Sequence, residues 1–480
     1  MNYRMIARIL GYAMLTEAVL MLPSVVIALL HGESILGFCA AIGCLIALGF
    51  TTISRKPEHN DIYAREGFVT VSLCWIVLSV FGAMPFYVEE ITPTFIDALF
   101  ETVSGFTTTG ASILSSVESV PYGILFWRSF THWIGGMGVL VFMMAVLPMA
   151  DNRNMHIMRA EVPGPVVGKL VPRAKDSALI LYGIYVALTL IEVVFLLFGG
   201  MPLFDAFVHA MGTAGTGGFG IKNNSVAYYN SAYIDIVISV FLILFSINFN
   251  LYFFILLGNL RPVFKNEELR CFLCIVGASV LAIALNINHL YGTFGESLRY
   301  SLFQVSSIVS TAGFSTADFN QWPELSRALL VGLMFIGACA GSTGGGIKIS
   351  RVMILAKSSS CEIRRMMHPR SVNLVKLEGK TVSDEVVHNA QVFFLLYMFI
   401  LAASTVLIAC FDECDFTTNL TAVIACIGNI GPGLEAVGPM GNFAFFSPVS
   451  KLVLIVNMLV GRLEIFPMIM LFHPNTWKRV

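Results

Sequence analysis

Residues 107–112 read TTTGAS and lie between two long apolar stretches of the chain. Three consecutive hydroxyl side chains followed by a glycine are not expected in a membrane-spanning helix. Irregular backbone is tolerated at membrane depth only where it is buried in protein or lines a water-filled cavity. TTTGAS therefore indicates a loop whose backbone faces something other than lipid, and similar breaks recur at three further places.

The chain has the composition of a membrane protein. It has 480 residues, of which 56% are hydrophobic and 12% charged, and its mean hydropathy is +0.79. A soluble protein of this length would not keep so apolar a composition in solution. The first apolar run lacks a signal-peptide cleavage site, so we expect it to be retained as a helix. Runs of spanning length occur at residues 11–30, 35–53, 68–88, 177–198, 232–257, 271–287, 391–410 and 449–472.

An internal repeat surrounds the breaks. FGAMP (81–85) and FGGMP (198–202) each end a long apolar span. An Asp-Ala pair follows each motif, and a glycine stands thirteen residues after each Asp: Asp97 and Gly110 in the first unit, Asp205 and Gly218 in the second. Self-similarity at a fixed period is typical of repeat architectures.

Two further stretches carry a glycine in the matching place. They read SSIVSTAGFST (306–316) and IACIGNIGPGL (424–434). The four breaks align as Thr108-Thr109-Gly110, Thr216-Gly217-Gly218, Thr311-Ala312-Gly313 and Asn429-Ile430-Gly431. The second carries two adjacent glycines, so which of them aligns stays open. A short helix is predicted before each break, over 95–106, 203–213, 297–309 and 416–427.

These patterns predict an all-α polytopic membrane protein. Four units of span, short re-entrant helix, glycine loop and span surround one pore, and two extra transmembrane helices come first. The predicted boundaries are 1–60 for the extra helices and 61–155, 156–262, 263–365 and 366–480 for the four pore repeats. Ten crossings and four half-crossings place both termini on the same side.

The charge distribution predicts that this side is the cytoplasm. With internal termini, internal segments hold 23 of the 29 Lys and Arg residues, as the positive-inside rule expects. The outer segments hold five cations, which are Arg128, Lys222, Arg299, Arg327 and Lys451. They also hold about fifteen acids, among them Glu89, Glu90, Glu101, Glu118, Asp412, Glu413 and Asp415. The glycine loops are therefore expected to open toward an acidic vestibule that concentrates cations.

The four loops are interpreted as quarters of an ion selectivity filter. Glycine adopts backbone conformations that other residues resist, so successive carbonyl groups can point the same way. A ring of carbonyl oxygens replaces the hydration shell of a cation. A single Thr-Gly pair is more often a helix kink, but four at matching positions favour the filter. Each loop has one aligned glycine rather than the two of TVGYG, so we expect fewer ion sites and looser discrimination than in a potassium channel.

The chain resembles the Trk/Ktr/HKT superfamily of potassium transporters, and most closely the ion-translocating membrane subunit of bacterial Trk systems. The resemblance covers nearly the whole chain and rests on the four loops and four motifs. These motifs are FWRSFTHWIGGMG (126–138), RAEVPGP (159–165), CAGSTGGGIKISR (339–351) and VGRLEIFP (460–467). The two extra N-terminal spans also fit the Trk branch.

The resemblance implies potassium uptake across the bacterial inner membrane through one pore, with K+ as the transported ion and no organic cofactor. It places the filter at Thr108–Gly110, Thr216–Gly218, Thr311–Gly313 and Asn429–Gly431. It also implies a homodimer in membrane lipid, controlled by a cytoplasmic nucleotide-binding ring subunit, with no nucleic-acid partner. The polar 355–388 segment, with Arg364, Arg365 and Arg370, is a plausible docking surface or simply a solvated basic loop.

A gate is expected below the filter. The span after the third filter loop is interrupted by a glycine-rich run, which consists of Gly341, Ser342, Thr343, Gly344, Gly345 and Gly346. Consecutive glycines break a helix, and a loop there obstructs the pore, as the family's intramembrane loop does. Ile347 separates Gly346 from Lys348, so the segment is not a phosphate-binding Walker loop. A static break for packing is the alternative.

Arg462 lies in the last span and is the other gate candidate, together with Lys348. A charged residue within a span usually faces a cavity or a partner. Facing the pore, Arg462 would repel cations and bind carbonyl groups of the obstructing loop, the role that the family resemblance implies. An ion pair with Glu464, or with a lipid headgroup near the inner surface, is the alternative. Glu17 and Glu192 are further intramembrane acids to which the sequence assigns no role.

Other function classes are disfavoured. His132, His156, His209 and His368 are isolated in the sequence, and no HExxH motif or nucleophile elbow occurs, so we do not expect an enzyme. A proton- or sodium-coupled potassium symporter is the stronger rival, and it would need a titratable group beside the ion site. A less selective monovalent cation uptake protein is also open. The filter itself holds only Thr, Asn and backbone, which favours channel-like passage.

Overall fold

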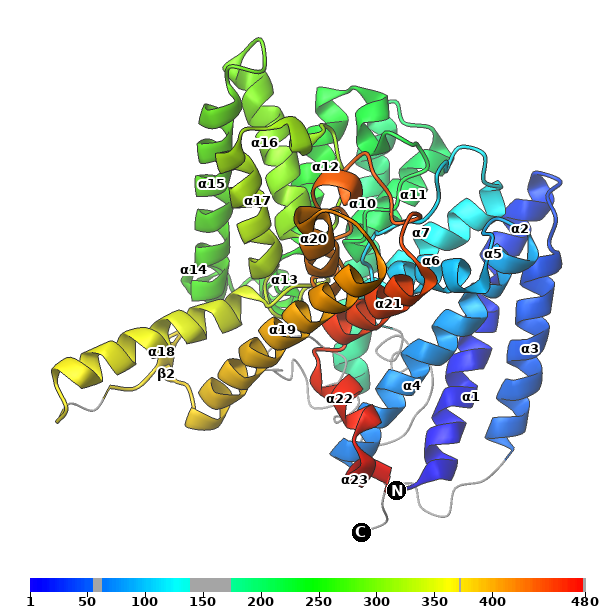
Figure 1. Cartoon of the computed structure of the whole chain (residues 1–480), viewed down its shortest axis with the longest axis horizontal. Coiled ribbons are helices and arrows are strands. Elements are labelled where there is room, and N and C mark those ends of the chain that lie inside the picture. Colours follow the sequence, from blue (N-terminus) through cyan, green and yellow to red (C-terminus); the bar gives the residue numbers. More distant parts are fainter. Residues whose placement is uncertain (55–62, 139–173, 371–372, 478–480) are drawn as a thin grey trace.

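The computed structural model describes residues 1–54, 63–138, 174–370 and 373–477 (Figure 1). The RAEVPGP motif at 159–165 and the predicted boundaries near 60 and 155 lie outside these residues. Residues 262 and 365, at the other two predicted boundaries, fall inside helices α14 (Arg261–Lys265) and α18 (Ile349–Met367).

The N-terminal helices form one edge of the molecule. Helix α1 (Tyr3–Leu20) continues after Met21 into α2 (Leu22–Leu30), and α3 (Leu36–Ile53) returns beside α1. The backbones approach closely, because a Cβ atom built on Gly11 would lie 2.3 Å from Thr52 Oγ1. Small residues allow such close packing of helices in membranes. Helix α4 (Ala64–Gly82) follows and ends at α5 (Met84–Val88).

The four predicted short helices are confirmed to within three residues. They are α6 (Phe95–Phe106), α11 (Leu203–Gly215), α16 (Phe294–Val309) and α20 (Phe416–Ile427). Three begin at a polar N-cap, because Thr94, Thr293 and Asp415 each accept a hydrogen bond from a backbone N–H in the first turn. Helix α11 begins after Pro202 instead. Each short helix ends where a glycine loop starts.

Two further helices flank each short helix, one before it and one after it. Those before it are α4, α10 (Ala174–Phe198), α15 (Glu267–Ile287) and α19 (Asp384–Phe411), and those after it are α7 (Tyr122–Met137), α12 (Ala232–Phe245), α17 (Glu324–Ile336) and α21 (Pro448–Arg462). Helix α12 bends by 92° into α13 (Phe249–Leu256), and α21 is followed by α22 (Phe466–Phe472) and α23 (Pro474–Trp477). The remaining elements are 3-10 turns at Ser225–Tyr229, Phe319–Gln321 and Glu435–Val437 and a hairpin of β1 (Lys376–Leu377) and β2 (Lys380–Thr381).

Within the described ranges, six helices are long and apolar enough to cross a membrane, or seven if the bent pair α12–α13 counts as one span. The other three crossings that the sequence predicts fall on α7, α17 and α21. These helices have 16, 13 and 15 residues, fewer than the roughly 20 of an ordinary span. Ten crossings therefore remain a prediction.

The two ends of the described chain meet. The Tyr3 hydroxyl donates to the carbonyl oxygen of Trp477 at 3.0 Å, and the two rings stack. Helices α1 and α23 lie together at the lower edge of Figure 1. This contact agrees with termini on one side, and the cytoplasmic orientation remains a prediction.

Four of the five outer cations form ion pairs, and three of these pairs join different predicted units. Arg299 on α16 binds Asp235 on α12 at 2.7 Å, and Lys451 on α21 binds Asp97 on α6 at 2.6 Å. Arg327 on α17 binds Glu435, which follows the fourth glycine loop. The fourth pair, Arg128 with Glu101, joins α7 to α6 at 2.5 Å. These contacts fix neighbouring units against one another.

We predict that Lys451→Met destabilises the protein. Lys451 and Asp97 are 7% and 4% exposed, so the substitution leaves a buried carboxylate without its cation and costs about 3 kcal/mol. The measurement is the midpoint of thermal unfolding in detergent, which should fall by several degrees.

Arg365→Met is the matched control, because Arg365 forms only an exposed pair with Glu362 and such pairs contribute little. The double variant Lys451→Met/Asp97→Asn should recover part of the loss. Equal midpoints for Lys451→Met and the wild type would contradict the prediction.

Candidate functional site

The four glycine loops share one backbone conformation. Their first residues, Thr108, Thr216, Thr311 and Asn429, have φ of 55°, 53°, 64° and 53°, and the glycines two positions later, Gly110, Gly218, Gly313 and Gly431, have φ of 80°, 74°, 85° and 95°. Left-handed φ is uncommon for threonine, so a common constraint imposes it. Gly217 is not among the residues with positive φ. Gly218 is therefore the aligned glycine of the second loop.

The loops close into a ring in chain order. A Cβ atom built on Gly110 would lie 2.0 Å from the carbonyl oxygen of Gly217, and one on Gly218 would lie 2.0 Å from that of Ala312. The same construction places Gly313 at 2.1 Å from Ile430 O and Gly431 at 2.8 Å from Thr109 O. Each glycine thus lies against the carbonyl oxygen that precedes the glycine of the next loop. No side chain fits at any of the four positions without displacing a neighbouring loop.

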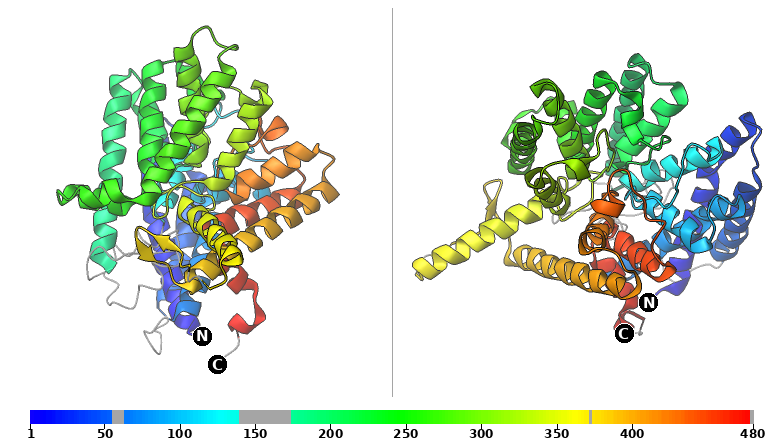
Figure 2. Two further views of the ribbon diagram at one scale, coloured as in Figure 1. Left: turned by 90° about the vertical axis from the view of Figure 1, so that its left-hand side faces the viewer. Right: turned by 45° about the horizontal axis from the view of Figure 1, so that its top comes forward.

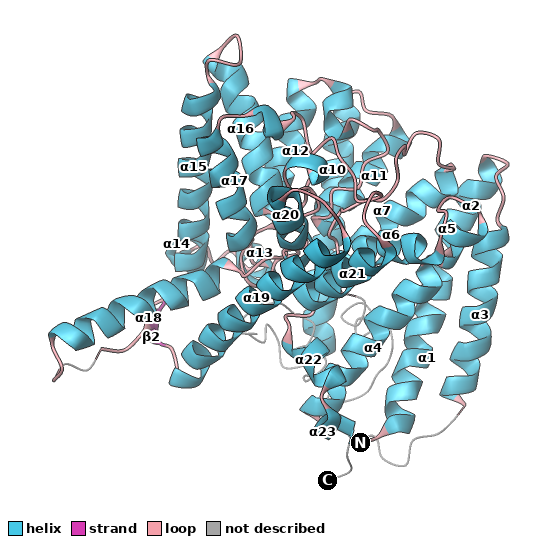
Figure 3. Ribbon diagram, viewed as in Figure 1, coloured by secondary structure: helices cyan, strands magenta, loops and turns pink. Residues whose placement is uncertain are grey.

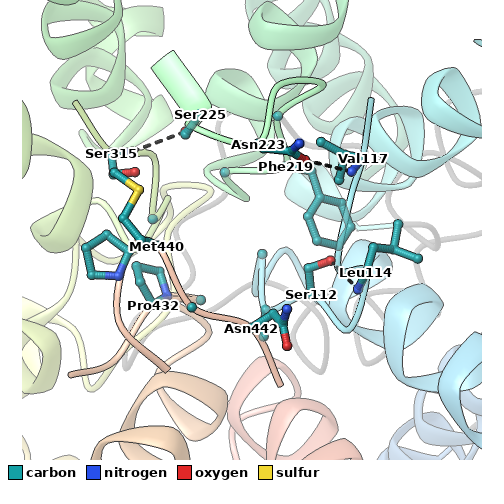
Figure 4. A pocket seen from close by; sticks show the side chains of 18 of the residues that line it. Ser112, Leu114, Val117, Phe219, Asn223, Ser225, Ser315, Pro432, Met440 and Asn442 are labelled. Atoms are coloured by element: carbon teal, nitrogen blue, oxygen red, sulfur yellow. Dashed lines mark hydrogen bonds between the residues drawn. The ribbon is translucent and has the colours of Figure 1, made fainter. Parts of the chain in front are cut away.

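All four glycines line one cavity of about 250 Å³. Figure 4 shows this cavity from close by, and its lining includes the polar residues Ser112, Asn223, Ser225 and Asn442. Loops lie between the helices in the middle of the molecule (Figure 3). Polar side chains therefore line the cavity next to the ring.

The expectation of an acidic vestibule is wrong for the wall of this cavity. Its lining holds no Asp or Glu in the described chain and includes Arg128 and Lys222. The outer acids instead hold the scaffold together. Glu89 accepts a hydrogen bond from Gly37 N at 2.8 Å, and Glu118 accepts one from Asn223 N at 3.3 Å. A count of charges cannot distinguish such structural carboxylates from those that face an ion.

Side chains behind the ring connect the loops. Asn429 Nδ2 donates to Thr109 Oγ1 and to Met458 O, both at 3.0 Å. Thr108 Oγ1 and Asn429 Oδ1 are buried, and neither has a hydrogen-bond partner. A buried oxygen without a donor calls for an explanation, and an ion is one. These two oxygens belong to the first position of the first and fourth loops.

His132 is a site residue that the sequence analysis missed, because it is isolated in the sequence but not in the fold. It lies on α7 and is fully buried. Its ring nitrogens contact Gly105 O at the end of α6 and Phe219 N in the second loop, at 2.7 and 3.3 Å. The FWRSFTHWIGGMG motif was the only signal that pointed to this position.

The glycine-rich segment lies directly against the ring, as expected of a gate. It runs from Gly337 to Lys348, between α17 and α18. Gly345 N donates to Thr311 Oγ1 at 2.6 Å, and a Cβ atom on Gly345 would lie 2.4 Å from Gly428 O. The segment therefore touches the third and fourth loops. We call residues 337–348 the gating loop, after the role that the sequence analysis predicts for this segment.

Arg462 makes the expected contact with this loop. Its Nη1 donates to Thr343 O at 2.8 Å, and its Nη2 donates to Gly135 O and Gly136 O on α7 at 2.5 and 2.9 Å. The alternative partner, Glu464, binds Arg351 instead. Lys348 Nζ donates to Gly344 O. Two cationic side chains thus bind carbonyl groups of the gating loop.

Glu268, on α15, is a further residue that the sequence did not single out. It is 7% exposed, and its Oε1 accepts hydrogen bonds from Ala340 N at 2.7 Å and Ser350 N at 3.1 Å. These donors lie near the two ends of the gating loop. A buried carboxylate therefore ties both ends together, and no local motif reveals this.

Comparisons with known proteins place this fold and these loops in a family. The family model for TrkH, described as "Cation transport protein", matches residues 36–479. The chain is 36% identical over 485 residues to the Trk system potassium uptake protein TrkH of Salmonella typhimurium (strain LT2), covering 100% of both chains. It is 34% identical to TrkG of Escherichia coli (strain K12), covering 99% of both.

A solved structure agrees. The crystal structure of the potassium transporter TrkH from Vibrio parahaemolyticus superposes with a TM-score of 0.89 at 32% identity, over 100% of both chains. The family model and relatives above 30% identity over the full chain agree on one assignment. This chain belongs to the TrkH family of cation transport proteins.

Proposed function

We propose that this protein takes up potassium by channel-like permeation through the ring of four glycine loops. The main support is the ring itself. Each glycine lies against the carbonyl oxygen of the residue before the glycine of the next loop, and all four glycines line one cavity. Carbonyl oxygens arranged around an axis replace the water around a dehydrated cation. The relatives named as potassium uptake proteins support K+ as the ion.

The filter residues are those that the sequence singled out. The carbonyl oxygens of Thr109, Gly217, Ala312 and Ile430 form the ring. Thr108 Oγ1 is a buried oxygen without a donor, and it is available to a cation next to that ring. Each loop has one aligned glycine and so provides few carbonyl layers, which supports looser discrimination among alkali cations than in a TVGYG filter.

The gating loop is proposed to close the pore. It contacts the third and fourth filter loops, and Arg462 and Lys348 hold it through Thr343 O and Gly344 O. Two positive charges beside the path of a cation raise its electrostatic energy, and this repulsion is strong where water is excluded. Opening therefore requires the loop and the Arg462 guanidinium to separate.

Control from the cytoplasm is also part of the proposal. Helix α18 begins at the gating loop and projects away from the other helices (Figure 2). Its exposed end carries Arg364, Arg365 and, just beyond it, Arg370. We assign this end to a nucleotide-binding ring subunit and expect a homodimer in the bacterial inner membrane, with both termini cytoplasmic.

A proton- or sodium-coupled symporter is less well supported. Such a carrier needs a titratable group at the ion site, and the described lining of the cavity contains no carboxylate. Glu17 and Glu192 are buried on α1 and α10, outside this lining. Channel-like passage needs neither of them.

We predict that Gly313→Ser reduces the preference for potassium over sodium. The serine Cβ atom would lie about 2.1 Å from Ile430 O, so the ring must deform. The measurement is rubidium uptake into proteoliposomes competed by K+ or Na+, repeated with the soluble partner and nucleotide if the wild type is inactive alone. The ratio should fall about tenfold, or about 1.4 kcal/mol of discrimination.

Gly332→Ser on α17 is the matched control, because a Cβ atom there meets nothing within 4 Å. It should leave the ratio unchanged. Robust uptake with the same K+/Na+ ratio in Gly313→Ser as in the wild type would mean that ions do not pass the ring.

We predict that Arg462→Gln raises the rate of uptake. The change removes a positive charge and weakens the charge-assisted hydrogen bond to Thr343 O, which is worth roughly 1.5–3 kcal/mol. A loop held less tightly opens more often, and the rubidium flux per protein should rise about tenfold. Arg261→Gln is the control at an exposed arginine of α14. An unchanged or lower flux in Arg462→Gln would contradict the gating role.

A further inference from the structure

The second filter loop departs from the other three at its middle position. The residue before the aligned glycine is Thr109, Ala312 or Ile430 in the other loops and Gly217 in this one. Thr109, Ala312 and Ile430 are buried, so their side chains fill space behind the ring. Loop 2 has no side chain of its own to fill that space.

The ring of His132 occupies this space. A Cβ atom built on Gly217 would lie 2.4 Å from His132 Cγ and Nδ1 and 2.6 Å from Cδ2. No real Cβ atom fits at such distances. Residue 217 is therefore a glycine because of the imidazole, while the other loops tolerate a side chain at the same backbone position.

The hydrogen bonds of His132 fix its tautomer. Nε2 lies 3.3 Å from Phe219 N, a backbone donor, so Nε2 must be the unprotonated nitrogen. Nδ1 then carries the proton and donates to Gly105 O at 2.7 Å. The neutral imidazole thus spans from the end of helix α6 in the first unit to the backbone just beyond Gly218 in the second.

Phe219 is held from a second side. The Arg128 guanidinium lies 3.5 Å from the centre of its ring, and Arg128 Nη1 donates to Gly220 O at 2.9 Å. The His132 and Phe219 ring centres are 4.1 Å apart. Both His132 and Arg128 belong to α7, so one helix of the first unit positions the backbone on the outer side of the second loop.

We propose that His132 is a positioning residue for ion selectivity, which sets the place of the Gly217 carbonyl oxygen in the filter ring. It does so by filling the space behind Gly217 and by accepting the Phe219 N–H. This role rests on the proposed function, because it presumes that cations pass the ring. It differs from that function in naming a side chain that contacts no ion.

The first test is His132→Asn, assayed by rubidium uptake into proteoliposomes with K+ or Na+ as competitor. Asparagine keeps an amide N–H close to the place of Nδ1 and can still donate to Gly105 O. It is too short to replace Nε2, so the Phe219 N–H loses its acceptor. We expect uptake to persist while the K+/Na+ competition ratio falls about tenfold, the effect of one lost buried hydrogen bond on the position of the loop.

His289→Asn is the control for the same substitution away from the ring. His289 is exposed in the turn between α15 and α16. This variant should keep the wild-type ratio. A wild-type ratio in His132→Asn, with normal protein yield and size-exclusion profile, would overturn the proposal.

The second test asks whether a side chain at position 217 clashes with the imidazole of His132. Gly217→Ala should strongly reduce selectivity alone, because the methyl group meets the imidazole. In a His132→Ala background, which is itself impaired, the same change should add almost nothing, since the ring is gone and the other loops accept a side chain there. Equal damage from Gly217→Ala in both backgrounds would overturn the proposal even if His132→Asn folds poorly.

The role of His132 and the filter assignment are distinguished by different results. If Gly313→Ser changes the ratio and the His132 and Gly217 variants behave independently, only the role of His132 is wrong. If Gly313→Ser also leaves the ratio unchanged while uptake is robust, the filter assignment itself is wrong.

Discussion

Ring closure is the constraint on which the rest of the structure depends. Each filter glycine lies where the carbonyl oxygen of the next loop leaves no room for a side chain. This contact requires four loops at one depth, each with left-handed backbone at two positions. Such backbone is costly for Thr108, Thr216, Thr311 and Asn429, so it persists only because the surroundings hold it. The short helices, their caps and the side chains behind the ring supply that support.

Charged side chains have different partners on the two sides of the ring. On the side that is predicted to face outward, Arg299, Arg327 and Lys451 form ion pairs between units. Among the described residues, Lys222 and Arg128 are the cations that line the cavity. Next to the gating loop, Arg462 and Lys348 bind backbone carbonyl groups. Both side chains bring positive charge next to the ring, and this charge acts on a nearby ion.

Patterns among neighbouring residues predicted much of this architecture. The remaining features depend on contacts between residues that are far apart in the chain. The glycine spacing predicted the loops and their helices, because both depend on neighbouring residues. It left Gly217 and Gly218 undecided, since the choice depends on φ and on the ring of His132. The contacts of Glu268 with the gating loop join residues more than seventy positions apart. The predicted acidic vestibule does not extend to the cavity wall, because outer carboxylates such as Glu89 and Glu118 bind backbone N–H groups, which a charge count does not reveal.

The most direct measurement is the location of bound ions in crystals grown with rubidium, by anomalous scattering. The account predicts a rubidium peak on the axis of the ring, coordinated by the carbonyl oxygens of Thr109, Gly217, Ala312 and Ile430. A rubidium peak bound elsewhere in the protein, with none at this ring, would contradict the central claim that these four loops form the ion path.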